Sequence, residues 1–122
     1  IKKYTPLSNI YNKETETRME SPIKIIPDKC TASKLSSYLI WCGIEDTTYP
    51  TEFPDDWYRG KISFKDTIWA IDLLTGQATP VVNTPEESGG RELDIINMTI
   101  GESERALYFI NKNDNTLWMY EL

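Results

Sequence analysis

The stretch that decides the fold is Asp66-Thr67-Ile68-Trp69-Ala70-Ile71-Asp72-Leu73, which returns 49 residues later as Asn115-Thr116-Leu117-Trp118-Met119-Tyr120-Glu121-Leu122. Both copies are rich in β-branched and aromatic residues, with a tryptophan in the middle and an acid near the end. Such a composition favours a β-strand. We therefore predict one strand in each copy, and we expect Trp69 and Trp118 to pack between repeated units.

A β-hairpin is predicted before each of these strands. Residues 28–34 and 38–44 form the arms of the first hairpin, and residues 94–112 repeat the pattern 68 positions later. The arm at residues 38–44 is apolar on both faces, as in a strand buried between two layers. The repetition of both hairpin and strand indicates two related units.

Two further strands are predicted outside these repeats. One covers roughly residues 7–12, and the other covers residues 78–82, where Pro80 favours the edge of a sheet. Residues 12–15 also resemble residues 72–75, which precede Gly76 and have the pattern of a turn. Asp72 is expected to cap that turn through its side chain.

The composition excludes several classes of function. The chain has 122 residues, a net charge of −6 and no histidine. An acidic chain repels phosphate backbones, so we expect no nucleic-acid binding, and no apolar run is long enough to span a membrane. Without histidine, the usual general base and the commonest transition-metal ligand are missing. We therefore expect no enzymatic activity, no cofactor and no metal. Residue 1 is Ile rather than Met, so we expect a processed chain or a piece of a longer one.

The two hairpins carry a resemblance to a known family. Thr-Ala-Ser-Lys-Leu-Ser-Ser-Tyr-Leu-Ile-Trp at residues 31–41 and Thr-Ile-Gly-Glu-Ser-Glu-Arg-Ala-Leu-Tyr-Phe at residues 99–109 resemble the blade hairpin of TolB-type β-propeller repeats. The family's Ser-Pro-Asp-Gly turn is not reproduced at residues 33–36 or 101–104. The resemblance implies a scaffold for binding partners, often in extracytoplasmic bacterial proteins, and it brings no catalytic residue.

The expected fold is therefore all-β, with two four-stranded antiparallel propeller-type blades and one strand of a preceding blade. Residues 1–15 would hold that strand, residues 16–75 a blade with a long insertion at 45–65, and residues 76–122 a second, C-terminal blade. Two blades cannot close a ring, so the remaining blades are expected from the same polypeptide or from another protein chain. The alternative is a free-standing β-sandwich of about eight strands.

Cys30 and Cys42 lie on the two arms of the first hairpin, in a register that places them opposite each other. Facing cysteines are at a separation that a disulfide accepts. The alternative is a pair of buried thiols that act as small hydrophobic side chains. A disulfide would indicate an exported protein, so we expect an extracytoplasmic location in the cell envelope or the secreted fraction.

The insertion at residues 45–65 carries the candidate binding residues. They are the aromatic and acidic side chains Tyr49, Phe53, Asp55, Asp56, Trp57 and Tyr58. Aromatic residues in a long loop serve as anchors for a partner, or they fold back over the sheet. The acids, with Asp46 and Glu52, are expected to form a solvated face rather than a calcium site, because the loop lacks the alternating ligands that such a site needs.

The leading functional hypothesis is a non-catalytic structural or protein-interaction module of an exported or cell-envelope β-propeller protein. One alternative is an accessory propeller domain of a larger hydrolase. Another is a carbohydrate-binding module that uses the aromatic side chains of the 45–65 loop, with Trp57 and Tyr58 as the sugar-stacking residues. Asn97-Met98-Thr99 fits the glycosylation triplet but lies in a predicted strand, so we expect it to be unoccupied.

Overall fold

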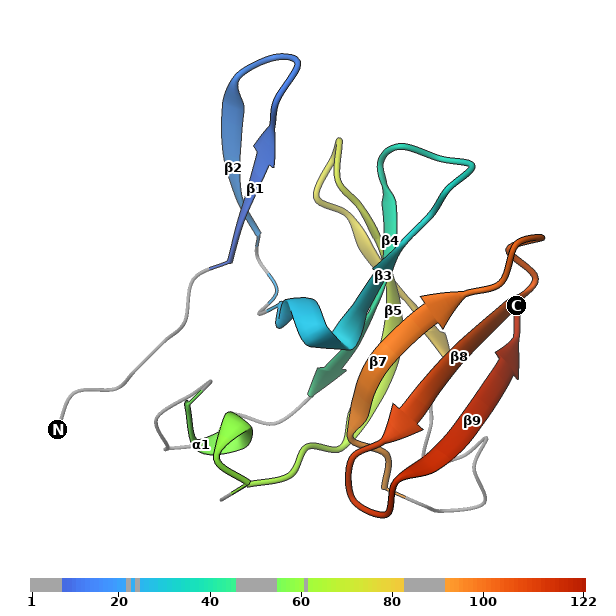
Figure 1. Ribbon diagram of the computed structural model, residues 1–122. Helices are drawn as coiled ribbons and strands as arrows, with labels where there is room; N and C mark the ends of the chain where they lie inside the picture. Colours follow the sequence, from blue (N-terminus) through green and yellow to red (C-terminus); the bar gives the residue numbers. More distant parts are fainter. Residues whose placement is uncertain (1–7, 22, 24, 46–54, 61, 83–91) are drawn as a thin grey trace, which may run out of the picture.

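The computed structural model describes residues 8–21, 23, 25–45, 55–60, 62–82 and 92–122. In these ranges the chain forms strands with two short helical segments, which confirms the predicted all-β class (Figure 1). The elements in chain order are β1 Ser8–Asn12, β2 Thr17–Ser21, the 3₁₀ turn η1 Pro27–Lys29, β3 Cys30–Ala32, β4 Leu39–Glu45, α1 Asp55–Tyr58, β5 Asp66–Asp72, β6 Ala78–Val82, β7 Ile95–Ile100, β8 Ala106–Asn111 and β9 Thr116–Glu121.

The strands make three antiparallel sheets, and within the described residues none of them closes on itself. The first is the two-stranded hairpin β1–β2, the second is a four-stranded sheet in the order β3-β4-β5-β6, and the third is a three-stranded sheet in the order β7-β8-β9. Each sheet is a meander, in which consecutive strands are neighbours. Propeller blades as such remain a hypothesis.

Strand β6 belongs to the four-stranded sheet. It pairs with β5, for example at Ile71 and Ala78, although the expected division of the chain placed residues 76–122 together in the second unit. It is the last strand of its sheet, so Pro80 lies on an edge as its missing N–H requires. The sheet therefore contains four successive strands of the chain, and the hairpin β7–β8 begins the next one.

The hairpins β3–β4 and β7–β8, which repeat each other, differ by one residue in the length of their turns. The β3–β4 turn is closed by a hydrogen bond from Ser33 N to Leu39 O (2.9 Å), and the β7–β8 turn by one from Gly101 N to Ala106 O (3.0 Å), so the second turn is one residue shorter. The offset of 68 predicted from the sequence therefore holds for β7 but becomes 67 for β8. As a result, Trp41 corresponds to Tyr108.

The hairpin β1–β2 repeats the hairpin β5–β6. In the first turn Asn12 Oδ1 accepts hydrogen bonds from the N–H groups of residues 14 and 15 (2.9 and 3.3 Å). In the second turn Asp72 Oδ1 accepts the same two bonds (2.8 and 3.3 Å), which confirms its capping role. Glu16 (φ 55°) takes the left-handed conformation of Gly76 (φ 75°). Within the described residues, two paired strands, β1 and β2, therefore precede the four-stranded sheet, where one had been expected.

The main core lies between the four-stranded and three-stranded sheets. The four-stranded sheet contributes Trp41 and Ile68 to this core. The three-stranded sheet contributes Ile95, Met98, Ile100, Leu107 and Phe109, and Leu93, which precedes β7, completes it. A second apolar cluster, centred on Cys42 and Ile71, covers the opposite face of the four-stranded sheet. Both faces of this sheet are therefore apolar, as the pattern of residues 38–44 predicts.

The two repeated tryptophans are partly buried and pack against apolar clusters, in keeping with their expected structural role. Trp69 packs against the cluster of Cys42 and Ile71. Trp118 packs against the main core, and its Nε1 donates a hydrogen bond to Thr116 Oγ1 (2.7 Å).

Candidate functional site

The expected aromatic insertion is only partly within the described residues. Tyr49 and Phe53 lie outside them. Asp55 and Asp56 start α1, a single helical turn that the sequence did not lead us to expect. Its two aromatic residues, Trp57 and Tyr58, have opposite environments.

Trp57 is 2% exposed and Tyr58 is 52% exposed. Burial, together with a hydrogen bond to the Asp28 carboxylate and its charge, raises the pKa of Tyr58. Trp57 folds back over the sheets, which is the second of the two roles considered for these aromatics, and Tyr58 alone among the described aromatic candidates faces the solvent.

Trp57 is fixed by polar and aromatic contacts. Its ring stacks on Phe64 with centroids 5.9 Å apart. Its Nε1 donates to both carboxylate oxygens of Asp94 (2.9 Å each), and its carbonyl oxygen accepts a hydrogen bond from Lys112 Nζ (3.0 Å). The insertion is thereby anchored to the end of the three-stranded sheet.

Beneath Trp57 lies a buried ionic cluster formed by Lys29, Asp66 and Asp94. Lys29 Nζ donates to Asp66 Oδ2, to Asp94 Oδ1 (2.6 Å) and to the carbonyl oxygen of Ile95 (2.9 Å). The side chain of Lys29 is 2% exposed and those of both acids are fully buried. Charged groups are almost never buried to this degree unless they are paired.

The ionic cluster joins distant parts of the chain. Lys29 ends η1, Asp66 begins β5 and Asp94 immediately precedes β7. Asp66 Oδ2 also accepts from Ile95 N (2.7 Å), so the same carboxylate binds the start of the three-stranded sheet. The cluster therefore fixes the four-stranded sheet, the three-stranded sheet and α1 to one another.

Burial raises the pKa of Asp66 to about 6, because the ionised carboxylate loses its contact with water. The charge of Lys29 and its hydrogen bond, with the bond from Ile95 N, oppose this shift, and the neighbouring charge of Asp94 adds to it. The cluster contains two acids and one base, so Asp66 is incompletely compensated.

This raised pKa predicts a stability that falls as the pH rises. Between the ordinary value of 3.8 and about 6, the folded protein holds a proton on Asp66 that the unfolded chain has lost. Ionising Asp66 therefore costs the folded state up to roughly 3 kcal/mol across this interval. We expect urea unfolding at pH 4 and pH 7 to show that Asp66→Asn removes this loss, whereas exposed Asp55→Asn does not. Equal pH dependence in wild type and Asp66→Asn would contradict the assignment.

The ionic cluster is closed to substrates. The rings of Trp57 and Phe64 cover Lys29 Nζ, at 4.8 and 5.3 Å from their centroids. Among the described residues, no group of three or more acidic or cysteine side chains could hold a metal ion. The arrangement thus supports a structural role for these charges. Lys29, Asp66 and Asp94 all lie in segments that were predicted as hairpin arms or as the repeated strand, but no sequence pattern indicated that the three would pair.

Cys30 and Cys42 form the expected disulfide, with Cα atoms 4.1 Å apart in directly paired positions of β3 and β4. Disulfides are typical of proteins in oxidising compartments. The bond links two neighbouring strands of the four-stranded sheet, on the face that lies away from the three-stranded sheet.

A second connection between the sheets lies at their turns. The Glu104 carboxylate, in the β7–β8 turn, accepts hydrogen bonds from Ser33 Oγ (2.5 Å) and from the N–H groups of Lys34 and Leu35 (2.8 and 2.9 Å) in the β3–β4 turn. The bond from Ser33 is the main reason that the pKa of Glu104 is lowered. One sheet is thus positioned on the other at both ends, by the ionic cluster and by Glu104.

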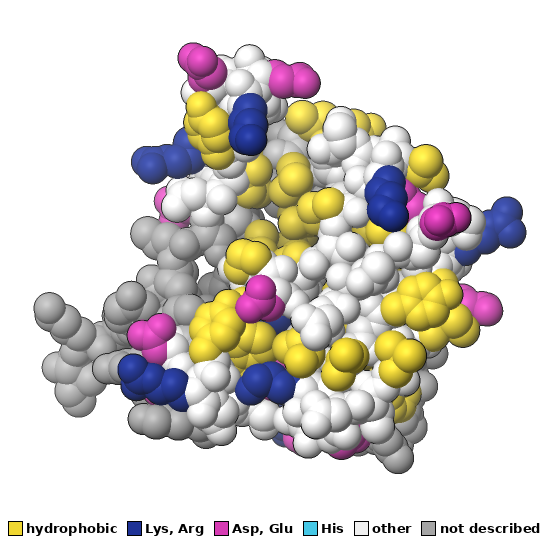
Figure 2. Space-filling model, in the orientation of Figure 1, with side chains coloured by type: hydrophobic (Ala, Val, Ile, Leu, Met, Phe, Trp, Pro, Cys, Tyr) yellow, Lys and Arg dark blue, Asp and Glu magenta, His cyan; other side chains and the backbone are white. Residues whose placement is uncertain are grey.

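The outer face of the three-stranded sheet is open. Its side chains are Tyr108, Ile110, Leu117 and Met119, which pair across β8 and β9. Tyr108 is 39%, Leu117 73% and Met119 55% exposed. Figure 2 shows hydrophobic side chains at the surface over this sheet.

The corresponding face of the four-stranded sheet is covered. Tyr108 and Leu117 correspond to Trp41 and Ile68, which are 6% and 0% exposed because the three-stranded sheet packs on them. The same kind of apolar face is therefore seen twice, once covered and once free.

The sequence matches no protein-family model, and no curated protein or solved structure is significantly similar to it. Nothing in these comparisons supports the resemblance to TolB-type repeats. In the part of the chain that the structure describes, no helix has the length and apolar character needed to cross a membrane.

Proposed function

We propose that this chain is a non-catalytic structural or protein-interaction module, in which the outer face of the three-stranded sheet takes a further β-sheet. The observation that carries the proposal is the contrast between the two corresponding faces. Ile68 is fully buried under a neighbouring sheet, whereas Leu117 at the equivalent position is 73% exposed. Large contiguous apolar patches on a protein surface mark interaction sites.

The kind of partner follows from the covered copy of the face. There, the covering element is an antiparallel sheet that contributes Leu107 and Phe109 to the core. An equivalent sheet on the open face would come from further units of the same polypeptide or from another protein chain. Stacking of successive meanders is the arrangement of propeller blades, and it supports a propeller-type fold. The proposed interaction through the open face does not depend on that fold or on the TolB-type resemblance.

The disulfide between Cys30 and Cys42 supports an exported or cell-envelope setting for this module. An accessory propeller domain of a larger hydrolase is compatible with the same open face. The carbohydrate-binding alternative is less well supported, because Trp57 is buried against Asp94 and cannot stack on a sugar.

The proposal predicts self-association of the isolated chain through the open face. We expect sedimentation velocity to show concentration-dependent association of the wild type, and Leu117→Lys/Met119→Lys to weaken it by more than about tenfold, because burying two such side chains stabilises a contact by roughly 1.5–3 kcal/mol each.

The matched control is Leu35→Lys/Leu74→Lys, which adds the same charge at two other exposed leucines. It should associate as the wild type does. Monomeric behaviour of the wild type at all concentrations, or equal association of both double variants, would count against the open face as an interaction surface.

A further inference from the structure

The hairpin β1–β2 has a free edge whose counterpart elsewhere in the chain is paired. In the equivalent hairpin β5–β6, strand β5 also pairs with β4, so that β5 has a neighbour on each side. Strand β1 occupies the position of β5 but pairs only with β2 in the described part of the chain. Among the described strands none pairs with its second row of N–H and C=O groups, and such a row is a template for an added strand.

An apolar hollow adjoins this free edge. Ile40, Trp69 and Leu73 are partly buried hydrophobic side chains of the cluster around Cys42 and Ile71, and Leu73 also lines a pocket together with Ile10 of β1. Figure 2 shows hydrophobic side chains in the hollow between the β1–β2 hairpin and this sheet. On its other face the same sheet is covered by the three-stranded sheet, so an apolar face of this sheet is seen to accept covering β-strands.

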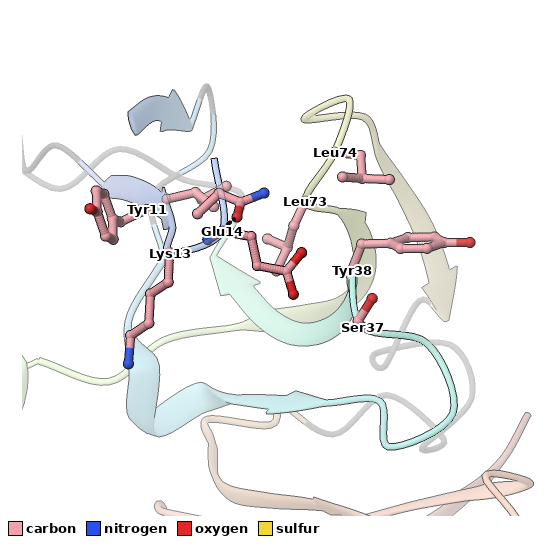
Figure 3. A pocket seen from close by; sticks show the side chains of 9 residues that line it. Tyr11, Lys13, Glu14, Ser37, Tyr38, Leu73 and Leu74 are labelled. Carbon is pink, nitrogen blue, oxygen red and sulfur yellow. Dashed lines mark hydrogen bonds between the residues drawn. The ribbon is translucent and has the colours of Figure 1, made fainter. Parts of the chain in front are cut away.

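The mouth of the hollow is a pocket of about 300 Å³. Its lining comes from the β1–β2 turn and from the turns at the end of the four-stranded sheet, and it includes Lys13, Glu14, Ser37, Tyr38 and Leu73. In Figure 3 the Glu14 carboxylate points across the pocket toward Leu73, and Lys13 points away. The charged group directed into the pocket is therefore an acid.

The residue that an added strand would place beside Glu14 can be located by equivalence. Glu14 corresponds to Leu74, and both residues donate their N–H to a turn-capping side chain. Next to Leu74, Leu73 N donates to Tyr38 O (2.7 Å), just before β4 begins. At the corresponding place in the three-stranded sheet, Leu122 N donates to Arg105 O (2.8 Å). An added strand beside β1 would take the place that β4 has beside β5, so the residue at the position of Tyr38 would lie next to Glu14. Tyr38 is a suitable neighbour for the apolar Leu74, whereas a basic residue at this position would be complementary to Glu14.

We propose that the free edge of β1 and the adjoining hollow bind an antiparallel β-strand of a partner protein, with apolar residues at alternate positions and a lysine or arginine at the end that meets Glu14. The backbone of β1 supplies the hydrogen bonds, and the face of Ile40 and Trp69 receives the apolar side chains. This is recognition by strand addition, in which the edge gives affinity and the alternate side chains give specificity. The site is distinct from the open face of the three-stranded sheet.

The test uses a synthetic peptide with the sequence of residues 105–112, Arg-Ala-Leu-Tyr-Phe-Ile-Asn-Lys, which has apolar residues at the alternate positions 107 and 109 and an initial arginine. We expect saturable binding to the intact chain, with hydrogen-exchange protection of β1 and not of β9. The variant Glu14→Lys should weaken binding about fivefold, as expected for a surface charge pair of up to about 1 kcal/mol. A peptide whose arginine is replaced by glutamate should recover the loss.

The control variant is Glu20→Lys, which makes the same change of charge on β2, away from the free edge, and should bind the peptide as the wild type does. A scrambled peptide that binds equally well, protection located on β9, or an unchanged affinity in Glu14→Lys would overturn the proposal. The double-lysine variant of the open face, Leu117→Lys/Met119→Lys, should retain peptide binding, so the two sites are tested separately.

Discussion

Replacing Lys29 by methionine is expected to lower the free energy of unfolding by about 3–5 kcal/mol, because it leaves two buried carboxylates without a cation. Asp66 and Asp94 would then face each other across a space that water does not reach. A domain of this size has only about 5–15 kcal/mol of stability, so the change removes a large share. Urea unfolding followed by tryptophan fluorescence at pH 7 measures it.

Two comparisons identify the cause of that loss. Lys65→Met removes a lysine that pairs with Glu92 at the surface, where both side chains are more than half exposed, and it should cost less than about 1 kcal/mol. The triple variant Lys29→Met/Asp66→Asn/Asp94→Asn removes the charges together and should be more stable than Lys29→Met alone. If Lys29→Met were as mild as Lys65→Met, the ionic cluster would not hold the sheets together.

Replacing Trp57 by alanine should cost a similar amount, about 3–5 kcal/mol. The indole is fully buried, stacks on Phe64 and donates its N–H to the Asp94 carboxylate. Its removal leaves a cavity above the ionic cluster and exposes Lys29 to water. We expect a lower unfolding midpoint in urea and a loss of hydrogen-exchange protection at the start of β7.

The neighbouring Tyr58 gives the matched control, since it lies on the same helical turn but is half exposed. Tyr58→Ala should cost less than about 1 kcal/mol, as surface substitutions usually do. Trp57→Phe keeps an aromatic ring but loses the hydrogen bond, and an intermediate loss of about 1–3 kcal/mol is expected. Equal stability of the two alanine variants would mean that Trp57 does not anchor the insertion.

Much of the fold could be predicted because strand patterns are local. The repeated stretch at residues 66–73 and 115–122 contains β5 and β9, and the strand predicted at residues 78–82 matches β6. The facing positions of Cys30 and Cys42 followed from the three-residue turn expected between the arms. In each case the side chains of a few neighbouring residues determine the structure.

The features that were missed depend on contacts between distant residues. The ionic cluster brings Lys29 to Asp66 and Asp94, which lie 37 and 65 positions away, and no periodicity marks such a pair. The inward position of Trp57 depends on Asp94 in the same manner. The shortened turn before β8 displaced the predicted alignment by one residue, which exchanges the two faces of a strand.

These missed contacts also change where a binding site should be sought. The aromatic side chains of the insertion were expected either to anchor a partner or to fold back over the sheet, and Trp57 folds back and joins the two sheets. Strands β8 and β9 together expose Tyr108, Leu117 and Met119 on one face. An interaction surface on regular strands is what the proposed interaction module needs.

The most direct test of the account is hydroxyl-radical footprinting of the native protein isolated from its source, combined with native mass spectrometry. The open face contains Tyr108, Leu117 and Met119, and methionine and tyrosine side chains are readily oxidised when exposed. We predict a particle heavier than 14.1 kDa in which these side chains are protected, while Leu35 and Tyr58 react. A particle of 14.1 kDa with Met119 and Tyr108 fully reactive would contradict the proposal that a further sheet covers this face.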